Sequence, residues 1–268
     1  MTIRPRRPPK TMNRASKLGI ACHQTLSFSP VMRFIPRSAV VFWPGCALMT
    51  LEPALLEKTL AILRRAEPEM ALAAACCGQP TACLFPQKKA GRKNYLAALL
   101  KARGVKRIYT ACPNCLLQLR QLEDVEILPV WPLLVQCLSE DDLANVTGDF
   151  IWHDPCPTRK DPDTQTACRR LLELSRQPVA QPAHTGQNTL CCGNIGMLHT
   201  TDPEKSARMR QIRLEELGQK TIVSGCEGCL SAFRREGRKT LHLLELLFGE
   251  SSSRGWHNRF KITQKAKR

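Results

Sequence analysis

The chain has 268 residues, 14 of which are cysteine, and a formal net charge of +17. It is longer than the disulfide-dense secreted scaffolds, and its basic N-terminus lacks the apolar stretch of a signal peptide. The sequence therefore predicts reduced thiols in the cytoplasm and argues against a secreted disulfide framework. Residues 39–51 come closest to a membrane span but are too short, so we expect a protein that is not transmembrane.

Most of the positive charge lies in two terminal segments. Residues 1–37 contain eight Arg or Lys and residues 251–268 contain six, and neither segment has an acidic residue. Neither shows sustained apolar periodicity, so both are predicted to be basic disordered tails. They are either solvated ends without a partner or docking segments for an acidic protein or an anionic membrane surface. Nucleic-acid binding is not expected, because the tails have few aromatic residues and the body has no recognisable reading module.

Strands and helices are expected to alternate through the first half, residues 38–147. The predicted strands are short runs of β-branched and small residues, and the predicted helices carry apolar residues at helical spacing. In chain order we expect a strand at 39–43, a helix at 53–66, a strand at 70–75, a helix at 88–103, strands at 107–110 and 125–130, and a short helix at 132–138. This alternation predicts an α/β fold with a parallel sheet and ligands at the carboxyl ends of its strands.

A similar order returns in the second half, residues 148–250. The expected elements are a strand at 150–152, a helix at 164–175, a helix from 203 to 217 and a strand at 221–223. The sequence therefore predicts two similar Rossmann-like halves that arose by internal duplication and are related by a pseudo-twofold.

Ten cysteines form two matching sets of five. Each set has one single cysteine, one Cys-Cys-Gly and one Cys-x-x-Cys, and corresponding cysteines are 110 to 115 residues apart. The first set is Cys46, Cys76, Cys77, Cys112 and Cys115, and the second is Cys156, Cys191, Cys192, Cys226 and Cys229. Such repetition with matched spacing predicts two metal centres.

The spacing favours a cluster over a single ion. Adjacent cysteines in a loop point in different directions, so they can reach two irons of one cluster more easily than one small ion. Gly78 and Gly193 allow a positive φ and a close approach of the backbone to the cofactor. Five thiolates exceed the four ligands of a tetrahedral zinc site or a simple cubane, so a larger or opened iron–sulfur cluster fits the number better. Zinc stays open as the alternative.

The motifs PGC, CCG and CPNC in the first half, with DPC, CCG and CEGC in the second, resemble the CCG (cysteine-rich) domain of the heterodisulfide reductase B-like iron–sulfur proteins. The resemblance covers roughly residues 38–250. It implies two [4Fe-4S] clusters, of cubane or noncubane form, each held by one cysteine set. It also implies cleavage of a disulfide in successive one-electron steps. Related subunits occur in glycerol-3-phosphate, lactate and fumarate-linked oxidoreductases.

The two motifs differ after the Cys-Cys-Gly. Residues 79–81 lack the glycines that are usual in that family, whereas Gly196 keeps one in the second half. Pro80 also removes a backbone N–H that could donate to a cluster sulfide. We therefore expect the second centre to be the substrate site and the first to be mainly an electron relay.

Three classes of function stay open. The protein is an iron–sulfur oxidoreductase subunit that reduces a disulfide-type substrate, or an electron-transfer subunit of a respiratory lactate- or glycerol-3-phosphate-type dehydrogenase without its own substrate site, or a structural zinc protein. The sequence has no ferredoxin cysteine run, dinucleotide fingerprint or haem motif. Electrons are therefore expected from a ferredoxin-like or flavin-containing donor subunit, in the cytoplasm or, with a membrane-associated partner, at the cytoplasmic membrane face.

Three residues near Cys156 are further candidates. His153 is the candidate for acid–base catalysis or for an extra ligand, and the alternative is an ordinary hydrogen-bonded histidine. Arg159 and Lys160 either attract an anionic substrate or lie in a solvated loop.

Four cysteines lie outside both sets. Cys137 and Cys168 share helix faces with leucines and are predicted to be core residues. Cys22 and Cys83 match no motif position and are expected not to be ligands.

Overall fold

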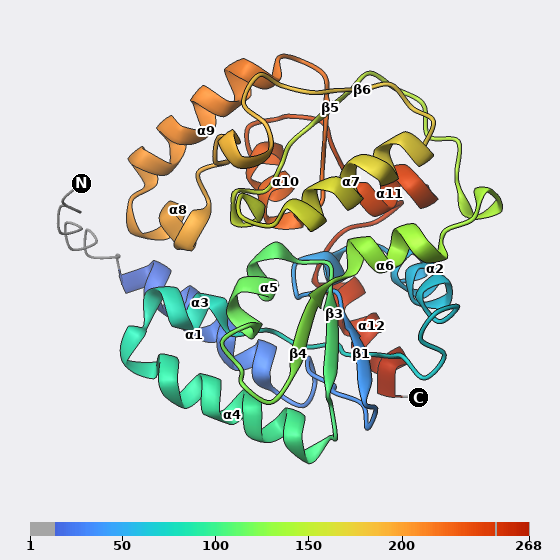
Figure 1. Cartoon of the computed structure of the whole chain (residues 1–268). Coiled ribbons are helices and arrows are strands. Elements are labelled where there is room, and N and C mark those ends of the chain that lie inside the picture. Colours follow the sequence, from blue (N-terminus) through green and yellow to red (C-terminus); the bar gives the residue numbers. More distant parts are fainter. Residues whose placement is uncertain (1–13, 250, 268) are drawn as a thin grey trace.

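The computed structural model describes residues 14–249 and 251–267, which form an α/β fold with two parallel sheets of four strands each (Figure 1). The strand order is β2-β1-β3-β4 in the first sheet and β6-β5-β7-β8 in the second. The strands are β1 Val40–Trp43, β2 Ala71–Leu72, β3 Arg107–Thr110, β4 Glu126–Pro129, β5 Phe150–Trp152, β6 Val179–Ala180, β7 Thr221–Ser224 and β8 Thr240–His242.

Helices connect the strands and flank both sheets. The first half contains α2 Pro53–Leu63, α3 Gln79–Leu84, α4 Lys89–Ala102, α5 Pro113–Leu119 and α6 Val130–Cys137. The second half contains α7 Pro162–Leu174, α8 Leu198–Thr201, α9 Pro203–Leu217, α10 Glu227–Arg234 and α11 Leu243–Phe248. Two further helices, α1 Arg14–Phe28 and α12 Trp256–Lys267, lie outside this repeated pattern.

The two halves repeat each other strand by strand, which confirms the predicted duplication. The first strand of each half, β1 or β5, lies between the second and third strands of that half. The third strand, β3 or β7, then pairs with the fourth. Because all pairs are parallel, the carboxyl ends of the central strands meet at one edge of each sheet.

A layer of four helices joins the halves. Helix α6 packs on α7, and α11 packs on α2, so each contact joins a helix of one half to the non-equivalent helix of the other. This exchange is what a pseudo-twofold axis produces. One hydrophobic core runs through the layer and includes Leu56, Trp131, Leu171 and Leu244, all almost fully buried. The halves are therefore packed against each other as one unit and share a hydrophobic core.

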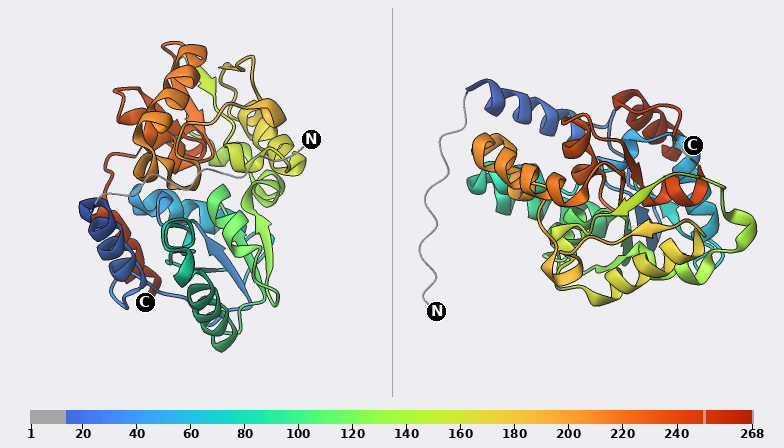
Figure 2. Two further views of the ribbon diagram at one scale, coloured as in Figure 1. Left: turned by 90° about the vertical axis from the view of Figure 1, so that its left-hand side faces the viewer. Right: turned by 90° about the horizontal axis from the view of Figure 1, so that it is seen from above.

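The prediction of disordered tails is wrong for residues 14–37 and 251–267. Helices α1 and α12 lie side by side against the first half (Figure 2). Helix α12 packs against α2 and a short 3-10 turn, η1 (Leu48–Thr50). The buried Arg259 donates to the hydroxyl of Ser27, which joins the two helices. Burial of Ile262 in the central core explains why this basic segment is ordered. The rest of the prediction, on residues 1–13 and 268, lies outside the described residues.

No helix within the described ranges has both the length and the hydropathy that a bilayer crossing requires. The domain boundaries at residues 147 and 250 stay a prediction.

Candidate functional site

Both cysteine sets lie where strands end. Cys46 follows β1 and Cys156 follows β5, in the same position of each half. The Cys-x-x-Cys pairs follow β3 and β7 and begin the helices α5 and α10. The Sγ of Cys112 caps α5 by accepting from the backbone N–H of Cys115 at 3.4 Å. The parallel topology thus gathers residues far apart in sequence at one end of each sheet.

Within the first set, the thiols form one continuous series of contacts. Cys76 accepts hydrogen bonds from Cys46 and Cys77, and Cys77 also contacts Cys115, which in turn bonds to Cys112. All five sulfurs of the set therefore converge.

The second set repeats this series in the same order. The Sγ atoms of Cys156 and Cys191 are 3.5 Å apart, and those of Cys192 and Cys229 are 3.2 Å apart. Cys191 also bonds to Cys192, and Cys229 to Cys226. The same pairwise order in both halves means that each offers the same arrangement of five sulfur donors to a metal or cluster. The assignment of these ten cysteines as ligands stays a prediction.

Gly78 and Gly193 shape the Cys-Cys-Gly turns. Both have φ of +83°, a conformation that L side chains rarely adopt. The N–H of Gly78 donates to Cys76 Sγ at 3.4 Å, and that of Gly193 donates to Cys191 Sγ at 3.3 Å. Each glycine therefore turns the chain so that a backbone N–H faces sulfur.

These contacts favour a thiolate at the first cysteine of each pair. Hydrogen bonds from Cys46, Cys77 and Gly78 hold the pKa of Cys76 well below its usual range, although burial opposes this. Hydrogen bonds from Cys156 and Cys192 and from backbone N–H groups lower the pKa of Cys191 in the same way. Because metals bind thiolates, both halves are electrostatically prepared for a metal at equivalent positions.

The first cysteine of the Cys-Cys-Gly has different backbone donors in the two halves. The N–H of Ile195 also bonds to Cys191 and lowers its pKa. The equivalent position in the first half is Pro80, at the start of α3, which has no N–H to give. The sulfur of Cys76 instead lies 3.9 Å from the side-chain amide of Gln24 on α1. Cys191 therefore has one more backbone donor than Cys76.

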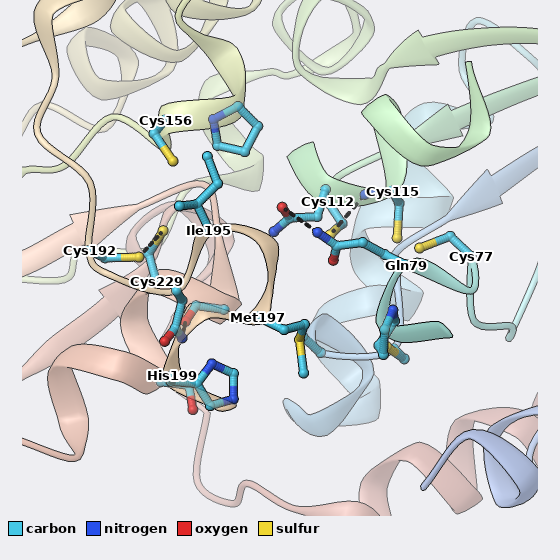
Figure 3. Close-up of a pocket in the computed structure, with 18 of the residues that line it drawn as sticks. Cys77, Gln79, Cys112, Cys115, Cys156, Cys192, Ile195, Met197, His199 and Cys229 are labelled. Carbon is cyan, nitrogen blue, oxygen red and sulfur yellow. Dashed lines mark hydrogen bonds between the residues drawn. The ribbon is translucent and has the colours of Figure 1, made fainter. Parts of the chain in front are cut away.

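The two sets face one cavity of about 340 Å³ between the halves (Figure 3). The Nδ2 of Asn114, from the first Cys-x-x-Cys, lies 3.9 Å from Cys226 Sγ of the second set and so links the two centres. The cysteines that line this cavity are Cys46, Cys77, Cys112, Cys115, Cys156, Cys192 and Cys229. One molecule in the cavity can therefore contact both centres.

Two histidines that the sequence analysis did not single out also line the cavity. His23 belongs to α1 and His199 to α8. Burial lowers the pKa of both, so both favour the neutral form. His23 lies far from any motif, and His199 follows the second Cys-Cys-Gly without a counterpart in the first half, so the repeated pattern could not have selected them. They are titratable groups in contact with whatever occupies the cavity.

The three candidates near Cys156 have different positions. His153 is fully buried, is not among the residues lining the cavity, and burial lowers its pKa to about 3. One of its ring nitrogens and the Sγ atoms of Cys192 and Cys229 lie within 4.8 Å of one another. Arg159 donates to the carbonyl oxygen of Thr189 and so helps to hold the loop that leads into the second Cys-Cys-Gly. Lys160 is exposed.

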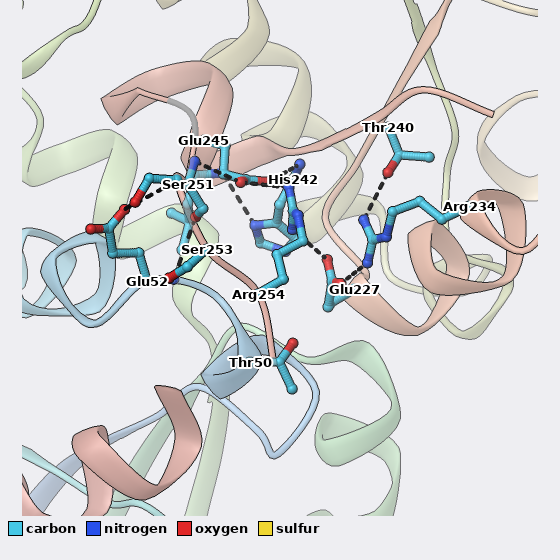
Figure 4. Close-up of polar contacts among 12 residues, drawn as sticks. Thr50, Glu52, Glu227, Arg234, Thr240, His242, Glu245, Ser251, Ser253 and Arg254 are labelled. Carbon is cyan, nitrogen blue, oxygen red and sulfur yellow. Dashed lines mark hydrogen bonds and ion pairs between the residues drawn. The ribbon is translucent and has the colours of Figure 1, made fainter. Parts of the chain in front are cut away.

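A buried charge network supports the second Cys-x-x-Cys (Figure 4). Glu227, between the two cysteines, pairs with Arg234 and is 3.8 Å from Arg254. Arg254 also contacts both carboxylate oxygens of the fully buried Glu245. Burial raises the pKa of Glu227 to about 7. The C-terminal segment therefore fixes the loop that carries Cys226.

The remaining cysteines lie away from the cavity walls. Cys137 and Cys168 belong to the central hydrophobic core, as predicted. Cys22 is exposed on α1, and Cys83 is half-buried in α3. None of the four lines the cavity between the halves.

Comparisons with curated proteins and with solved structures give little information about this chain. No curated protein matches the chain. An aspartate racemase from Picrophilus torridus has 10% identity and a TM-score of 0.34, over 85% of this chain and 94% of that one. An aspartate racemase homologue from Pyrococcus horikoshii OT3 has 11% identity and a TM-score of 0.28, over 86% and 100%. Scores this low carry no argument about function.

The family comparison is more informative. The cysteine-rich domain called CCG matches twice, over residues 40–120 and 150–234, which together make up more than half of the chain. The matches and the clustered thiols are compatible with binding of a metal or an iron–sulfur cluster. The chain belongs to the CCG cysteine-rich domain family and contains two copies of that domain.

Proposed function

We propose that each cysteine set holds one [4Fe-4S] cluster and that the protein is the oxidoreductase subunit of a complex resembling heterodisulfide reductase. The donor set fits such a group, because five sulfurs converge in each half and a glycine N–H faces one of them. A fifth thiolate is more than a zinc ion or a simple cubane uses, so the noncubane form is favoured. The clusters would store and pass single electrons.

The shared cavity is the observation that carries the substrate proposal. Reduction of a disulfide consumes two electrons and two protons, breaks the S–S bond and releases two thiols. A disulfide in this cavity lies against cysteines of both centres, so electrons can reach it from either side. His23 and His199, on the cavity walls, are the groups that we assign to proton relay, because a neutral imidazole can accept a proton at one ring nitrogen and donate the proton on the other.

Electrons come from outside the chain in this proposal. A ferredoxin-like or flavin-containing subunit delivers them to the first centre, which passes them to the second, where the substrate reacts. The additional N–H of Ile195 supports this order, because a donor beside Cys191 stabilises added negative charge. We place the complex in the cytoplasm, or at the cytoplasmic face of the membrane with a membrane-associated partner.

Anaerobic reconstitution tests the cofactor proposal. The protein should bind about eight irons and as many sulfides per chain and show low-temperature electron paramagnetic resonance signals on reduction. The Cys77→Ser and Cys192→Ser variants should each lose one of two spectroscopically distinct clusters. Cys168→Ser, in the hydrophobic core, is the matched control and should keep both. Stoichiometric zinc and no iron would contradict the proposal.

Addition of a small dialkyl disulfide tests the substrate proposal. It should alter the signal of the wild-type protein and of Cys77→Ser. The wild type should reduce it to thiol, and Cys77→Ser should do so more slowly because its electron relay is impaired. The Cys192→Ser variant should not turn it over. If the clusters form normally but do not respond to any disulfide, the substrate proposal is wrong. The protein is then an electron-transfer subunit without its own substrate site.

A further inference from the structure

Two buried N–H groups occupy equivalent positions beside the two centres. Trp43 stands three residues before Cys46, as His153 stands three residues before Cys156. Both side chains are fully buried. Trp43 Nε1 and His153 Nε2 both lack a hydrogen-bond partner within the described part of the chain. A buried N–H without an acceptor is costly, so two unpaired donors at matched positions indicate the same kind of acceptor beside each.

The side chain of Arg213 determines which nitrogen of His153 carries the proton. Its Nε–H donates to His153 Nδ1 at 3.0 Å. An arginine has only donors, so Nδ1 must offer a lone pair and the proton of the neutral ring lies on Nε2. A histidine that binds a metal usually donates its other N–H to an acceptor, which is the reverse arrangement. His153 is thereby set up as a donor and is unsuited to be a ligand through Nε2.

Both side chains are buried in the part of the protein that carries the cysteines of their own half. His153 groups with Cys192 and Cys229, within 4.8 Å. Trp43 shares a buried cluster with Cys77 and Cys115, the corresponding cysteines of the first set. Neither side chain lines the cavity, and both are fully buried, so neither is placed to contact a molecule in the cavity.

We propose that the Nε2–H of His153 and the Nε1–H of Trp43 each donate a hydrogen bond to a sulfur of the cluster in their half, with Arg213 as the positioning residue of His153. This inference rests on the proposed function, because the acceptors are cluster sulfurs. Such donors stabilise the additional negative charge of a reduced cluster and raise its reduction potential. The two centres thus reach their potentials with different donors, an imidazole and an indole.

Potentiometry on the full-length reconstituted protein tests the role of each donor. The His153→Phe variant should lower the midpoint potential of the second cluster only, and Trp43→Phe that of the first only. Phe233 packs on the edge of the His153 ring, with ring centroids 5.0 Å apart. Phe233→Leu changes this packing but keeps the N–H, so it is the matched control and should leave both potentials unchanged. Unchanged potentials in both donor variants would overturn the inference.

A measurement on unmodified sequence covers the case in which a donor variant does not fold. Wild-type protein made with histidine labelled in its ring nitrogens should show a weak coupling between one cluster and a histidine nitrogen by pulsed electron paramagnetic resonance. A strong coupling would mean direct ligation, and no coupling would mean no contact; either result overturns the proposal. Failure of the wild-type protein to bind iron would instead refute the proposed function itself.

Discussion

Replacement of Gly193 by alanine should destabilise the protein much more than the same change at Gly78. Both glycines have φ of +83°, so the backbone strain of alanine, about 1–2 kcal/mol, is common to both. The surroundings differ. A Cβ at position 193 would lie 2.2 Å from the carbonyl oxygen of Ser206 in α9, whereas a Cβ at position 78 would lie 2.9 Å from Cγ of the Arg92 side chain.

The difference between these neighbours sets the magnitude. The side chain of Arg92 is half-buried and can turn away, but the Ser206 carbonyl belongs to a helix backbone. Forcing extra atoms into a packed site typically costs about 1–3 kcal/mol. We therefore expect Gly193→Ala to lower the free energy of unfolding by about 2–5 kcal/mol and Gly78→Ala by about 1–2 kcal/mol. Entropy lost by the unfolded chain is the same for both variants and cancels in the comparison.

Urea titration of the two variants, with and without reconstituted iron, measures the difference. As urea is added, the ratio of bound iron to protein should fall at a lower urea concentration in Gly193→Ala than in Gly78→Ala. The reason is that the turn that holds Cys191 must move. Equal loss of stability, or a larger loss in Gly78→Ala, would refute the argument from the Ser206 carbonyl.

Two further predictions follow from the packing and from the pKa shifts. Deletion of residues 251–267 should lower the free energy of unfolding by at least about 2 kcal/mol, because burial of one aliphatic side chain such as Ile262 contributes about that much. A thermal melt with an unchanged midpoint would contradict this prediction. The hydrogen bonds from Arg65 hold the pKa of Asp142 below its usual range, so this carboxylate stabilises the fold above pH of about 4 and stops doing so as the pH falls further. Asp142→Asn should therefore show a flatter fall in stability under acid than the wild type, and parallel curves would count against this pair.

The repeated elements could be predicted because their sequences follow the expected patterns. The predicted bounds of β3 and β5 are correct because each is a short run rich in β-branched or aromatic residues just before a cysteine motif. The short strands β6 and β8 were missed, because two or three residues without a β-branched run give no periodicity to recognise.

The helices α1 and α12 were missed for a different reason. Their patterns are inverted, with polar side chains buried and apolar ones exposed. Gln24 and Asn258 are buried, whereas Leu26, Trp256 and Phe260 are 53%, 44% and 45% exposed. The rule that a helix buries its apolar face therefore predicts no helix in such segments. Tertiary hydrogen bonds, which no periodicity reveals, add to the burial of Ile262 in holding these helices in place.

The site was predicted only as far as its cysteines. Matched spacing reveals two sets, but it does not say that the sets face each other. That arrangement depends on the four-helix layer, in which α6 meets α7 and α2 meets α11. The cavity between the halves, and His23 and His199 on its walls, exist only because of this packing.

The return of α12 to the first half affects the order in which the chain can finish folding during synthesis. The carbonyl oxygen of Thr50, four residues after Cys46, accepts hydrogen bonds from Gly255 and from Asn258, 208 residues further along the chain. At about 5–20 residues per second, a ribosome needs roughly 10 to 40 seconds to make the intervening chain. The half that emerges first is therefore completed last. Its thiols must stay reduced throughout that interval, and the second half can gather its own cysteines before the first is closed.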